Sequence, residues 1–355
     1  MQLVKKGRKM KLLNEKVKNI CLVVEGGIGK NIAATAVVKS IKTAYPTKNI
    51  IILAGCPEVF FYNPNVKKVF NFNNPLHFYD DYINDETIIF KEEPYLTYGY
   101  INKETHLIQA WCDVLGVENV QKTPDMYFLE SELESAQMYI DELKSKKKGA
   151  KGFIMFQWVG GKTPDQNTNL EYKKALAPMF RRAIKHDTAV SICKELLAKD
   201  YIVGVVGHEN FPKIEGTEKI FFPIRSTLAL LKYSNAFIGI DSFLQHAAAS
   251  DALLTDGIVL WGGTCPECLG YSSHINLTKK VCSQPFCHRP NSFLFDMQSH
   301  GAMWECPYGE PCLKWKKEEV MEAFATIALK EVPYTEVVET KTECKTGCTK
   351  EKDKA

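Results

Sequence analysis

Apolar runs alternate with amphipathic stretches along most of the chain. In the first third, the runs NICLVV, NIIILAG and KKVFNF are typical of buried strands, and NIAATAVVKSIKTAY between the first two has apolar residues at helical spacing. Further helices are expected at 103–115 and 130–146. Strand, helix and strand in short succession predict a parallel sheet with helices between its strands.

A second alternating set follows the charged stretch KSKKKGAK. The expected strands are GFIMFQWV, YIVGVVG, KIFFP, NAFIGI and GIVLWGG, and the expected helices are AVSICKELLAK, RSTLALLKY and SFLQHAAAS. A last helix, KKEEVMEAFATIALKEV, closes the folded part. The two sets predict an α/β protein with two Rossmann-like domains whose parallel sheets face each other across a cleft.

The pattern also suggests where the domains begin and end. We expect a basic extension at 1–17, a first domain at 18–148, a second domain at 149–332, and a charged tail at 333–355. In the tail, the stretch ETKTECKTGCTKEKDKA is charged and lacks aromatic residues, a composition typical of a disordered segment.

Composition narrows the functional class. The chain has 355 residues, of which 45% are hydrophobic and 25% charged, as in ordinary soluble globular proteins. The 45 basic and 42 acidic residues nearly balance, and no basic stripe is interleaved with aromatics, so composition does not favour nucleic-acid binding, without excluding it. The N-terminus lacks the pattern of a signal peptide, and no apolar run reaches membrane-spanning length. These features predict a cytoplasmic protein.

A glycine-rich turn, GGIG, separates the first expected strand from the first helix. Its residues are Gly26, Gly27, Ile28 and Gly29. Such a turn lets backbone N–H groups and the helix dipole face an anion or a sugar. The motif matches neither the dinucleotide-binding glycine pattern nor the P-loop, so a purely structural turn is an equal alternative.

A second constellation is NAFIGIDSFLQHAAA. Asp241 stands where a strand ends, Ser242 is the expected N-cap of the next helix, and His246 follows one turn later. A carboxylate, a hydroxyl and free helix N–H groups at the carboxyl end of a strand can bind a phosphorylated ligand in an open α/β sheet. The alternative is a capping aspartate beside a core histidine.

Four segments together resemble a known family. They are GGIGKNIAATAVVKSIKTAYP, NPNVKKVF, LALLKYSNAFIGIDSFLQHAAAS and VLWGGTCPECLGY, and the chain is similar to the heptosyltransferases of glycosyltransferase family 9 from about residue 18 to 330. The resemblance implies the GT-B fold. It also implies transfer of a sugar, typically heptose from an ADP-sugar, to a lipopolysaccharide core, with inversion and without an essential metal.

The resemblance assigns expected roles in donor binding. Asp241, Ser242 and the N–H groups of Phe243 and Leu244 would hold the pyrophosphate and sugar of the donor, and His246 would support that loop. Phe243 stands where the family usually has glycine, which suggests a differently shaped sugar pocket.

Other donor contacts are less fixed by the resemblance. Glu209 matches the acidic residue that the family presents to the nucleoside ribose, although a surface acid is the alternative reading. A basic partner for the pyrophosphate is expected early in the second domain, where four candidates occur: Lys162, Arg181, Arg182 and Lys185.

Lys30 departs from the family pattern. The family commonly has an aspartate there as general base, whereas a protonated lysine cannot accept the proton of the acceptor hydroxyl. Glu25 or another acid across the cleft could serve as base instead, Lys30 could bind an anionic donor or acceptor, or the protein could bind a nucleotide sugar without rapid turnover. Lys30, Glu25 and Asp241 are therefore the candidate catalytic residues.

Cysteines crowd into CPEC, CSQPFCH and CPYGEPC. The best four ligands for a structural zinc ion are Cys282, Cys287, Cys306 and Cys312. Reduced packing cysteines or disulfides are the alternative, and no catalytic role is expected for them.

These observations lead to one functional hypothesis and two alternatives. The hypothesis is an inverting glycosyltransferase that needs no cofactor, takes a nucleoside-diphosphate sugar, preferably an ADP-sugar, and acts on a glycan or lipid-linked acceptor, as at a membrane surface. The first alternative is a non-catalytic nucleotide-sugar-binding protein. The second is a glycosyltransferase with a nucleic-acid or protein acceptor.

Overall fold

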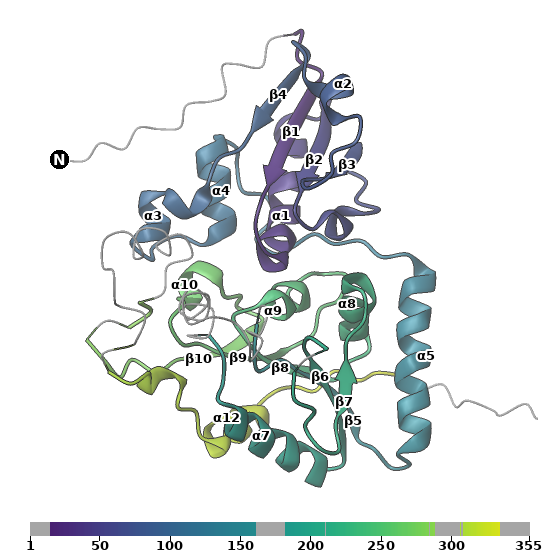
Figure 1. Ribbon diagram of the computed structural model, residues 1–355, viewed down its shortest axis with the longest axis vertical. Coiled ribbons are helices and arrows are strands. Elements are labelled where there is room, and N and C mark those ends of the chain that lie inside the picture. Colours follow the sequence, from purple (N-terminus) through teal and green to yellow (C-terminus); the bar gives the residue numbers. More distant parts are fainter. Residues whose placement is uncertain are drawn as a thin grey trace, which may run out of the picture.

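The computed structural model describes residues 15–160, 182–209, 211–283, 285–287, 306 and 308–333. Most of the expected extension at 1–17 and of the tail at 333–355 therefore lies outside the described residues. The described chain forms two parallel β-sheets, each accompanied by helices (Figure 1). The α/β class and the two sheets predicted from the sequence are confirmed.

The first sheet has the strand order β3-β2-β1-β4. Its strands are β1 (Asn19–Val24), β2 (Asn49–Ala54), β3 (Lys68–Asn71) and β4 (Thr87–Phe90). Around it lie α1 (Ile28–Ala44), α2 (Phe78–Tyr82), α3 (Tyr98–Ile101), α4 (Leu107–Leu115) and the 3₁₀ helices η1 (Pro57–Phe60) and η2 (Pro94–Leu96). β1 and β2 are apolar almost throughout because they are buried on both faces.

The second sheet has the strand order β10-β9-β8-β5-β6-β7. Its strands are β5 (Gly152–Phe156), β6 (Tyr201–Val206), β7 (Glu218–Ile220), β8 (Ala236–Ile240), β9 (Gly257–Leu260) and β10 (His274–Leu277). Its helices are α5 (Glu130–Lys146), α7 (His186–Ala198), α8 (Ile224–Lys232), α9 (Phe243–Ala248), α10 (Pro266–Leu269), α12 (Lys317–Phe324) and the 3₁₀ helix η3 (Pro311–Leu313).

The last helix is shorter than the sequence predicts. The expected helix spans 316–332, whereas α12 ends at Phe324. The N–H groups of Thr326 and Ile327 bond to carbonyls three residues back, which tightens the chain into turns. Beyond these turns, the N–H of Lys330 donates to the carbonyl of Asn235, the residue just before β8. This bond holds the chain beside the start of β8, so the helix does not continue.

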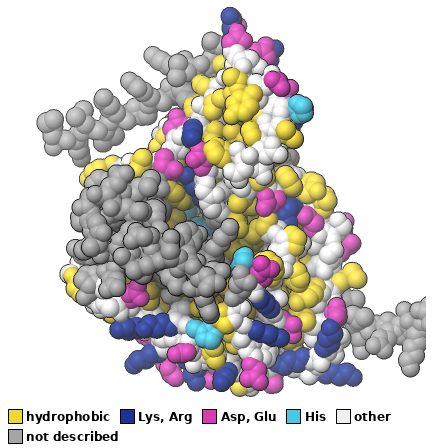
Figure 2. All heavy atoms as spheres, viewed as in Figure 1, with side chains coloured by type: hydrophobic (Ala, Val, Ile, Leu, Met, Phe, Trp, Pro, Cys, Tyr) yellow, Lys and Arg dark blue, Asp and Glu magenta, His cyan; other side chains and the backbone are white. Residues whose placement is uncertain are grey.

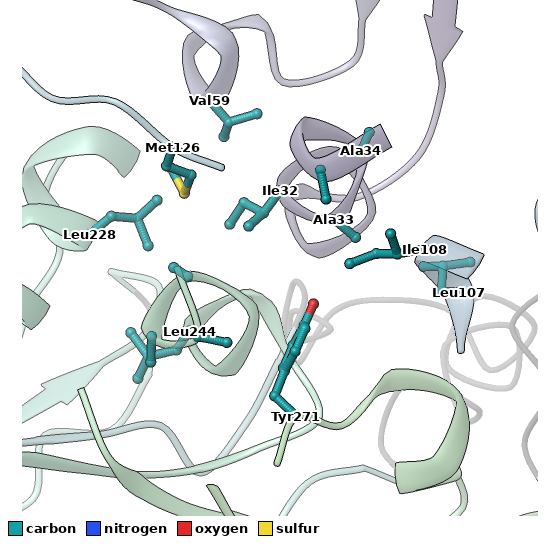
Figure 3. Close-up of a cluster of buried hydrophobic side chains, with 14 of the residues drawn as sticks. Ile32, Ala33, Ala34, Val59, Leu107, Ile108, Met126, Leu228, Leu244 and Tyr271 are labelled. Carbon is teal, nitrogen blue, oxygen red and sulfur yellow. The ribbon is translucent and has the colours of Figure 1, made fainter. Parts of the chain in front are cut away.

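A single apolar cluster joins elements of both sheets. Ile32 on α1, Met126, Leu228 on α8 and Leu244 on α9 all belong to it, and Figure 3 shows these side chains pointing toward one another. α1 and α9 lie against each other at its centre. Burial of apolar surface therefore holds the two sheets and their helices together.

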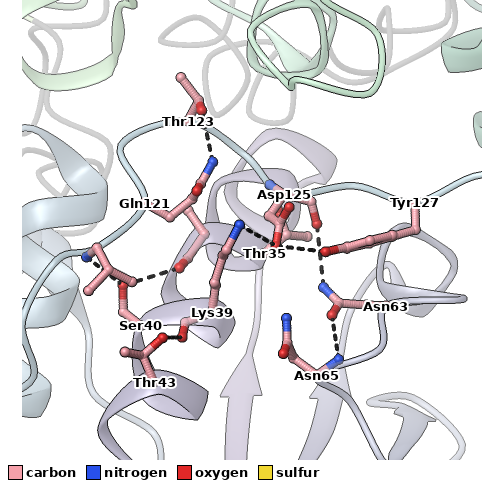
Figure 4. A network of polar contacts seen from close by, with 12 residues as sticks. Thr35, Lys39, Ser40, Thr43, Asn63, Asn65, Gln121, Thr123, Asp125 and Tyr127 are labelled. Carbon is pink, nitrogen blue, oxygen red and sulfur yellow. Dashed lines mark hydrogen bonds and ion pairs between the residues drawn. The ribbon is translucent and has the colours of Figure 1, made fainter.

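The connection between the sheets is anchored to the polar side of α1 (Figure 4). The Thr35 hydroxyl accepts a hydrogen bond from the Asp125 N–H at 2.8 Å, and the Ser40 hydroxyl accepts one from the Val120 N–H at 3.2 Å. Lys39 Nζ lies 3.7 Å from Asp125 Oδ2. These bonds give hydrogen-bond partners to two hydroxyls that are buried on α1.

No helix within the described ranges combines the length and the apolar character needed to cross a membrane. On the face shown in Figure 2, charged side chains of both signs are interspersed over the second-sheet part of the molecule.

Candidate active site

Each sheet has one point where the chain order reverses. In the first sheet, β1 pairs with β2 on one side and with β4 on the other. In the second sheet, β5 pairs with β6 and β8 in the same way. Crevices outside the carboxyl ends of strands at such points are the usual ligand sites of open α/β sheets. The segments that follow β1, β4, β5 and β8 are therefore the candidate positions for a ligand site.

The glycine turn follows β1, as predicted. Gly26 has a φ of +102°, a conformation that favours glycine. The buried side chain of Asn31 braces the turn, because its amide donates to the carbonyls of Gly26 at 3.2 Å and Gly27 at 3.0 Å. Its oxygen accepts a hydrogen bond from the Cys56 N–H at 3.2 Å. Sequence reasoning missed Asn31, and its signal is an amide in the first turn of an apolar helix.

The two motifs singled out in the sequence meet in space. A Cβ atom added at Gly29 would lie 2.9 Å from His246 Cδ2 and 3.6 Å from Phe243 Cα. The start of α1 thus lies against the start of α9, and the space at Gly29 is too small for a side chain.

Asp241 follows β8 and is almost completely buried, with 3% of its side chain exposed. Arg182 Nη1 donates to the Asp241 backbone carbonyl at 3.2 Å and lies 3.6 Å from Oδ2. The side chain of Gln157, which follows β5, donates to Ser242 Oγ at 3.1 Å. Ser242 occupies the predicted N-cap position, but no side-chain capping bond forms there.

Several polar atoms in this group are buried and have no hydrogen-bond partner within the described part of the chain. They are Asp241 Oδ2, Arg182 Nε and Gln157 Oε1. Buried polar atoms are normally paired, and leaving one unpaired costs about 1–3 kcal/mol. Two acceptors and one donor left open beside each other are suited to a polar ligand.

His246 is neutral at physiological pH. Burial, followed by the neighbouring His106 and Arg182, lowers the pKa of His246 to about 3. Its Nδ1 lies 2.9 Å from the hydroxyl of Tyr271, and its Nε2 lies 3.9 Å from Asp241 Oδ1. His246 therefore contacts Asp241 as an uncharged ring.

The Lys30 side chain is 9% exposed and lies among side chains that the sequence did not link to it. Its Nζ lies 2.8 and 3.1 Å from the two carboxylate oxygens of Glu93, which follows β4. The same ammonium lies 5.0 Å from the ring centre of Tyr95 and 5.4 Å from that of Trp111. Carboxylate and aromatic faces together stabilise a buried cation.

The remaining predicted residues lie elsewhere. Glu25 is ion-paired with Lys91 at 2.5 Å. Glu209 is exposed in the loop after β6, where its carbonyl accepts a hydrogen bond from Lys219. Lys185 is exposed just before α7. The candidates Lys162 and Arg181 lie outside the described residues.

The four cysteines of the predicted zinc site lie in the part of the chain that the structure describes. Burial raises the pKa of Cys312 to about 11. Three further cysteines add to that rise through their charge: Cys287, Cys282 and Cys306. No group of three or more His, Cys, Asp or Glu side chains within the described ranges is placed to hold a metal ion. The zinc site at Cys282, Cys287, Cys306 and Cys312 therefore stays a prediction.

Comparison with known proteins places the fold. No protein-family model and no curated protein matches the sequence. A solved glycosyltransferase of family 9 from Veillonella parvula matches with a TM-score of 0.58 and 13% identity, over 87% of this chain and 96% of that one. The ADP-heptose lipopolysaccharide heptosyltransferase II of E. coli matches with a TM-score of 0.56 and 13% identity, over 86% of this chain and 97% of that one.

A third similar structure is the dodecameric, iron-containing heptosyltransferase TibC of enterotoxigenic E. coli, in complex with ADP-D-β-D-heptose. Its TM-score is 0.54 at 12% identity, over 88% of this chain and 77% of that one. At these identities the likeness concerns the fold, and this chain has the fold of the family 9 glycosyltransferases.

Proposed function

We propose that this chain is a glycosyltransferase that moves a sugar from a nucleoside-diphosphate sugar to an acceptor hydroxyl with inversion, in the two-domain GT-B arrangement. The shared fold supports the reaction class. The observation that carries the proposal is the set of open polar atoms on Asp241, Arg182 and Gln157 at the switch point of the second sheet.

The chemistry of this group suits a sugar pyrophosphate. The guanidinium of Arg182 and the N–H groups at the start of α9 would stabilise the charge that develops on the leaving pyrophosphate. The Asp241 carboxylate would repel phosphate, and its open Oδ2 is suited to accept a hydrogen bond from a sugar hydroxyl. Gln157 and Ser242 would complete the polar contacts.

The proposed donor is an ADP-sugar and the proposed acceptor a lipopolysaccharide-type glycan. Support comes from similar structures, one of which is a complex with ADP-D-β-D-heptose and another a lipopolysaccharide heptosyltransferase. A nucleotide-sugar-binding protein without turnover is the second candidate, because Lys30 stands where a carboxylate base is expected.

Calorimetric titration with ADP, UDP, GDP and CDP tests the donor site. One nucleotide should bind with micromolar affinity, and Arg182→Met should weaken that binding at least about 10-fold, because a charged hydrogen bond to phosphate contributes about 1.5–3 kcal/mol. Lys194→Met removes the same charge from an exposed position on α7 and is the matched control. Absence of binding by all four nucleotides would contradict the proposal.

Turnover separates the two candidates. Release of ADP from ADP-heptose by the protein would support a transferase. Tight binding of the nucleotide sugar without any release, in the presence of lipopolysaccharide-core acceptors, would favour the binding protein.

A further inference from the structure

The Lys30–Glu93 pair lies at the switch point of the first sheet. Lys30 is in the first turn of α1, after β1, and Glu93 lies three residues beyond the end of β4. β1 and β4 are adjacent parallel strands, so both residues emerge at the same sheet edge. We propose that Glu93 is the general base that takes the proton of the acceptor hydroxyl, and that Lys30 positions it. This inference rests on the proposed transferase function.

The two partners differ in their access to solvent. The Lys30 side chain is 9% exposed, whereas that of Glu93 is 33% exposed. Both carboxylate oxygens are within hydrogen-bond distance of the Lys30 ammonium, which fixes the orientation of the carboxylate. The Lys30 ammonium is buried and already bonded to Glu93. The Glu93 carboxylate is the more exposed member of the pair, so a substrate can reach it.

The other acidic candidates are less suited to this role. Asp241 is buried beside Arg182, and Glu25 is held by Lys91. Of these three carboxylates, Glu93 alone combines partial exposure with a partner that is itself buried.

Tyr95 connects the pair to the donor site. Its ring lies under the Lys30 ammonium. The pKa of Tyr95 is raised by burial first and then by the charges of Glu93 and Asp241, while Arg182 opposes the rise. One phenol therefore lies within the electrostatic reach of both the Lys30–Glu93 pair and the Asp241–Arg182 pair. Lys30 also follows Gly29, where an added Cβ atom would lie 2.9 Å from His246 Cδ2.

The proposed sugar transfer is a displacement at the anomeric carbon that a base assists. The acceptor oxygen forms a bond to the anomeric carbon while its proton passes to a Glu93 carboxylate oxygen. The bond from the anomeric carbon to the pyrophosphate oxygen breaks, and its electron pair leaves with the nucleoside diphosphate. Glu93 then releases this proton to solvent.

The test uses ADP-heptose as donor, with water or azide as acceptor, and follows ADP release. With water, Glu93→Gln should release ADP about 100-fold more slowly than wild type, since general bases contribute about 10²–10⁴-fold. The affinity for ADP should stay unchanged. Azide is already an anion and has no proton to remove, so azide should restore ADP release by Glu93→Gln. A merely structural role would not produce this rescue.

Lys30 is tested through its dependence on Glu93. Lys30→Met should slow release in the wild-type background by lowering kcat with little effect on the KM for ADP-heptose, but should slow it no further in Glu93→Gln. Glu92→Gln, an exposed neighbouring carboxylate, is the matched control and should behave as wild type.

Two failures can be told apart. If Glu93→Gln releases ADP to water at the wild-type rate, or if azide fails to rescue it, Glu93 is not the base. Failure of the wild-type protein to bind any nucleotide would instead contradict the proposed function.

Discussion

At the scale of single residues, Arg225 makes more contacts between distant segments than any candidate site residue described above. Its guanidinium donates to both Glu132 oxygens at 2.6 Å and to the carbonyls of Glu58 and Tyr127 at 2.9 and 2.8 Å. It also lies 4.7 Å from the ring centre of Phe128. One side chain on α8 thus fastens α5, η1 and the connection between the sheets.

Replacing this arginine should destabilise the protein strongly. Arg225→Met should lower the free energy of unfolding by about 2–4 kcal/mol, because it leaves the Glu132 carboxylate and two carbonyls without their donor. Urea denaturation measures the change. Lys232→Met, at the other end of α8, is the control. A change below about 1 kcal/mol for Arg225→Met would show that water replaces the lost donors.

The Arg225–Glu132 ion pair predicts that the stability of the protein depends on pH. Hydrogen bonds from Arg225 lower the pKa of Glu132 below its ordinary value of 4.5. A depressed folded-state pKa contributes stability that is present above the unfolded pKa and is lost as pH falls through the folded value. The stability advantage of wild type over Glu132→Gln should therefore be constant above about pH 5 and shrink below pH 4.5 in urea titrations. An advantage that stays constant down to pH 3 would contradict this account.

The sequence pointed to some of the candidate site residues and missed others for a physical reason. Gly26, Asp241 and Ser242 were found because each stands at the end of a recognisable strand. Glu93 was not, because it meets Lys30 across 63 positions and follows a strand that the pattern did not reveal. Pairing between distant segments leaves no local signal.

At the scale of elements, the contact between α1 and α9 depends on a missing side chain. A Cβ atom at Gly29 would lie too close to the buried ring of His246, whereas a Cβ atom at Gly27 would meet nothing within 4 Å. Because Tyr271 and Gln245 contact the His246 ring, the ring cannot easily move aside.

The two glycines provide a matched pair. Gly29→Ala should destabilise the protein by about 1–3 kcal/mol through overpacking, and should weaken nucleotide binding because His246 adjoins Asp241. Gly27→Ala should leave both quantities nearly unchanged. Thermal unfolding and calorimetric titration of the two variants give the comparison. Equal effects of the two substitutions would mean that α1 and α9 adjust freely.

Element prediction succeeded where the apolar runs were long. β1, β2, β5, β6 and β8 were predicted close to their observed bounds, because strands buried on both faces give continuous apolar runs. β4 and β10 were missed. Each has only four residues, and neither is fully buried, so no continuous buried run marks it.

At the scale of the whole molecule, the apolar cluster shared by α1, α8 and α9 makes the stability of the two sheets interdependent. Ile32→Ala should lower the free energy of unfolding by about 2–5 kcal/mol. Hydrogen exchange should then speed up in β9 of the second sheet as well as in β2 of the first. Ile192→Ala, which lies in the cluster confined to the second sheet, is the comparison. Faster exchange in β2 alone would show that the two parts unfold independently.

The overall class was accessible from the sequence, but the contacts between the sheets were not. Alternating strands and helices sufficed for two parallel sheets. Which helix faces which was not encoded in any periodicity, because α1 packs against the first sheet, η1, α4 and α9 at once and so has no single buried face.

The candidate chemistry is carried by segments that follow strands, and the strands themselves contribute none of it. The stretch from 91 to 106 contains Glu93, Tyr95 and the exposed Leu96 and Tyr98, and it leaves the sheet at β4 and rejoins the fold at α4. The same stretch contains Tyr100, which is buried in the apolar cluster shared by both sheets, and Tyr95, which packs against that cluster. A substitution near Glu93 therefore risks changing stability together with the candidate chemistry, because one short connection serves both.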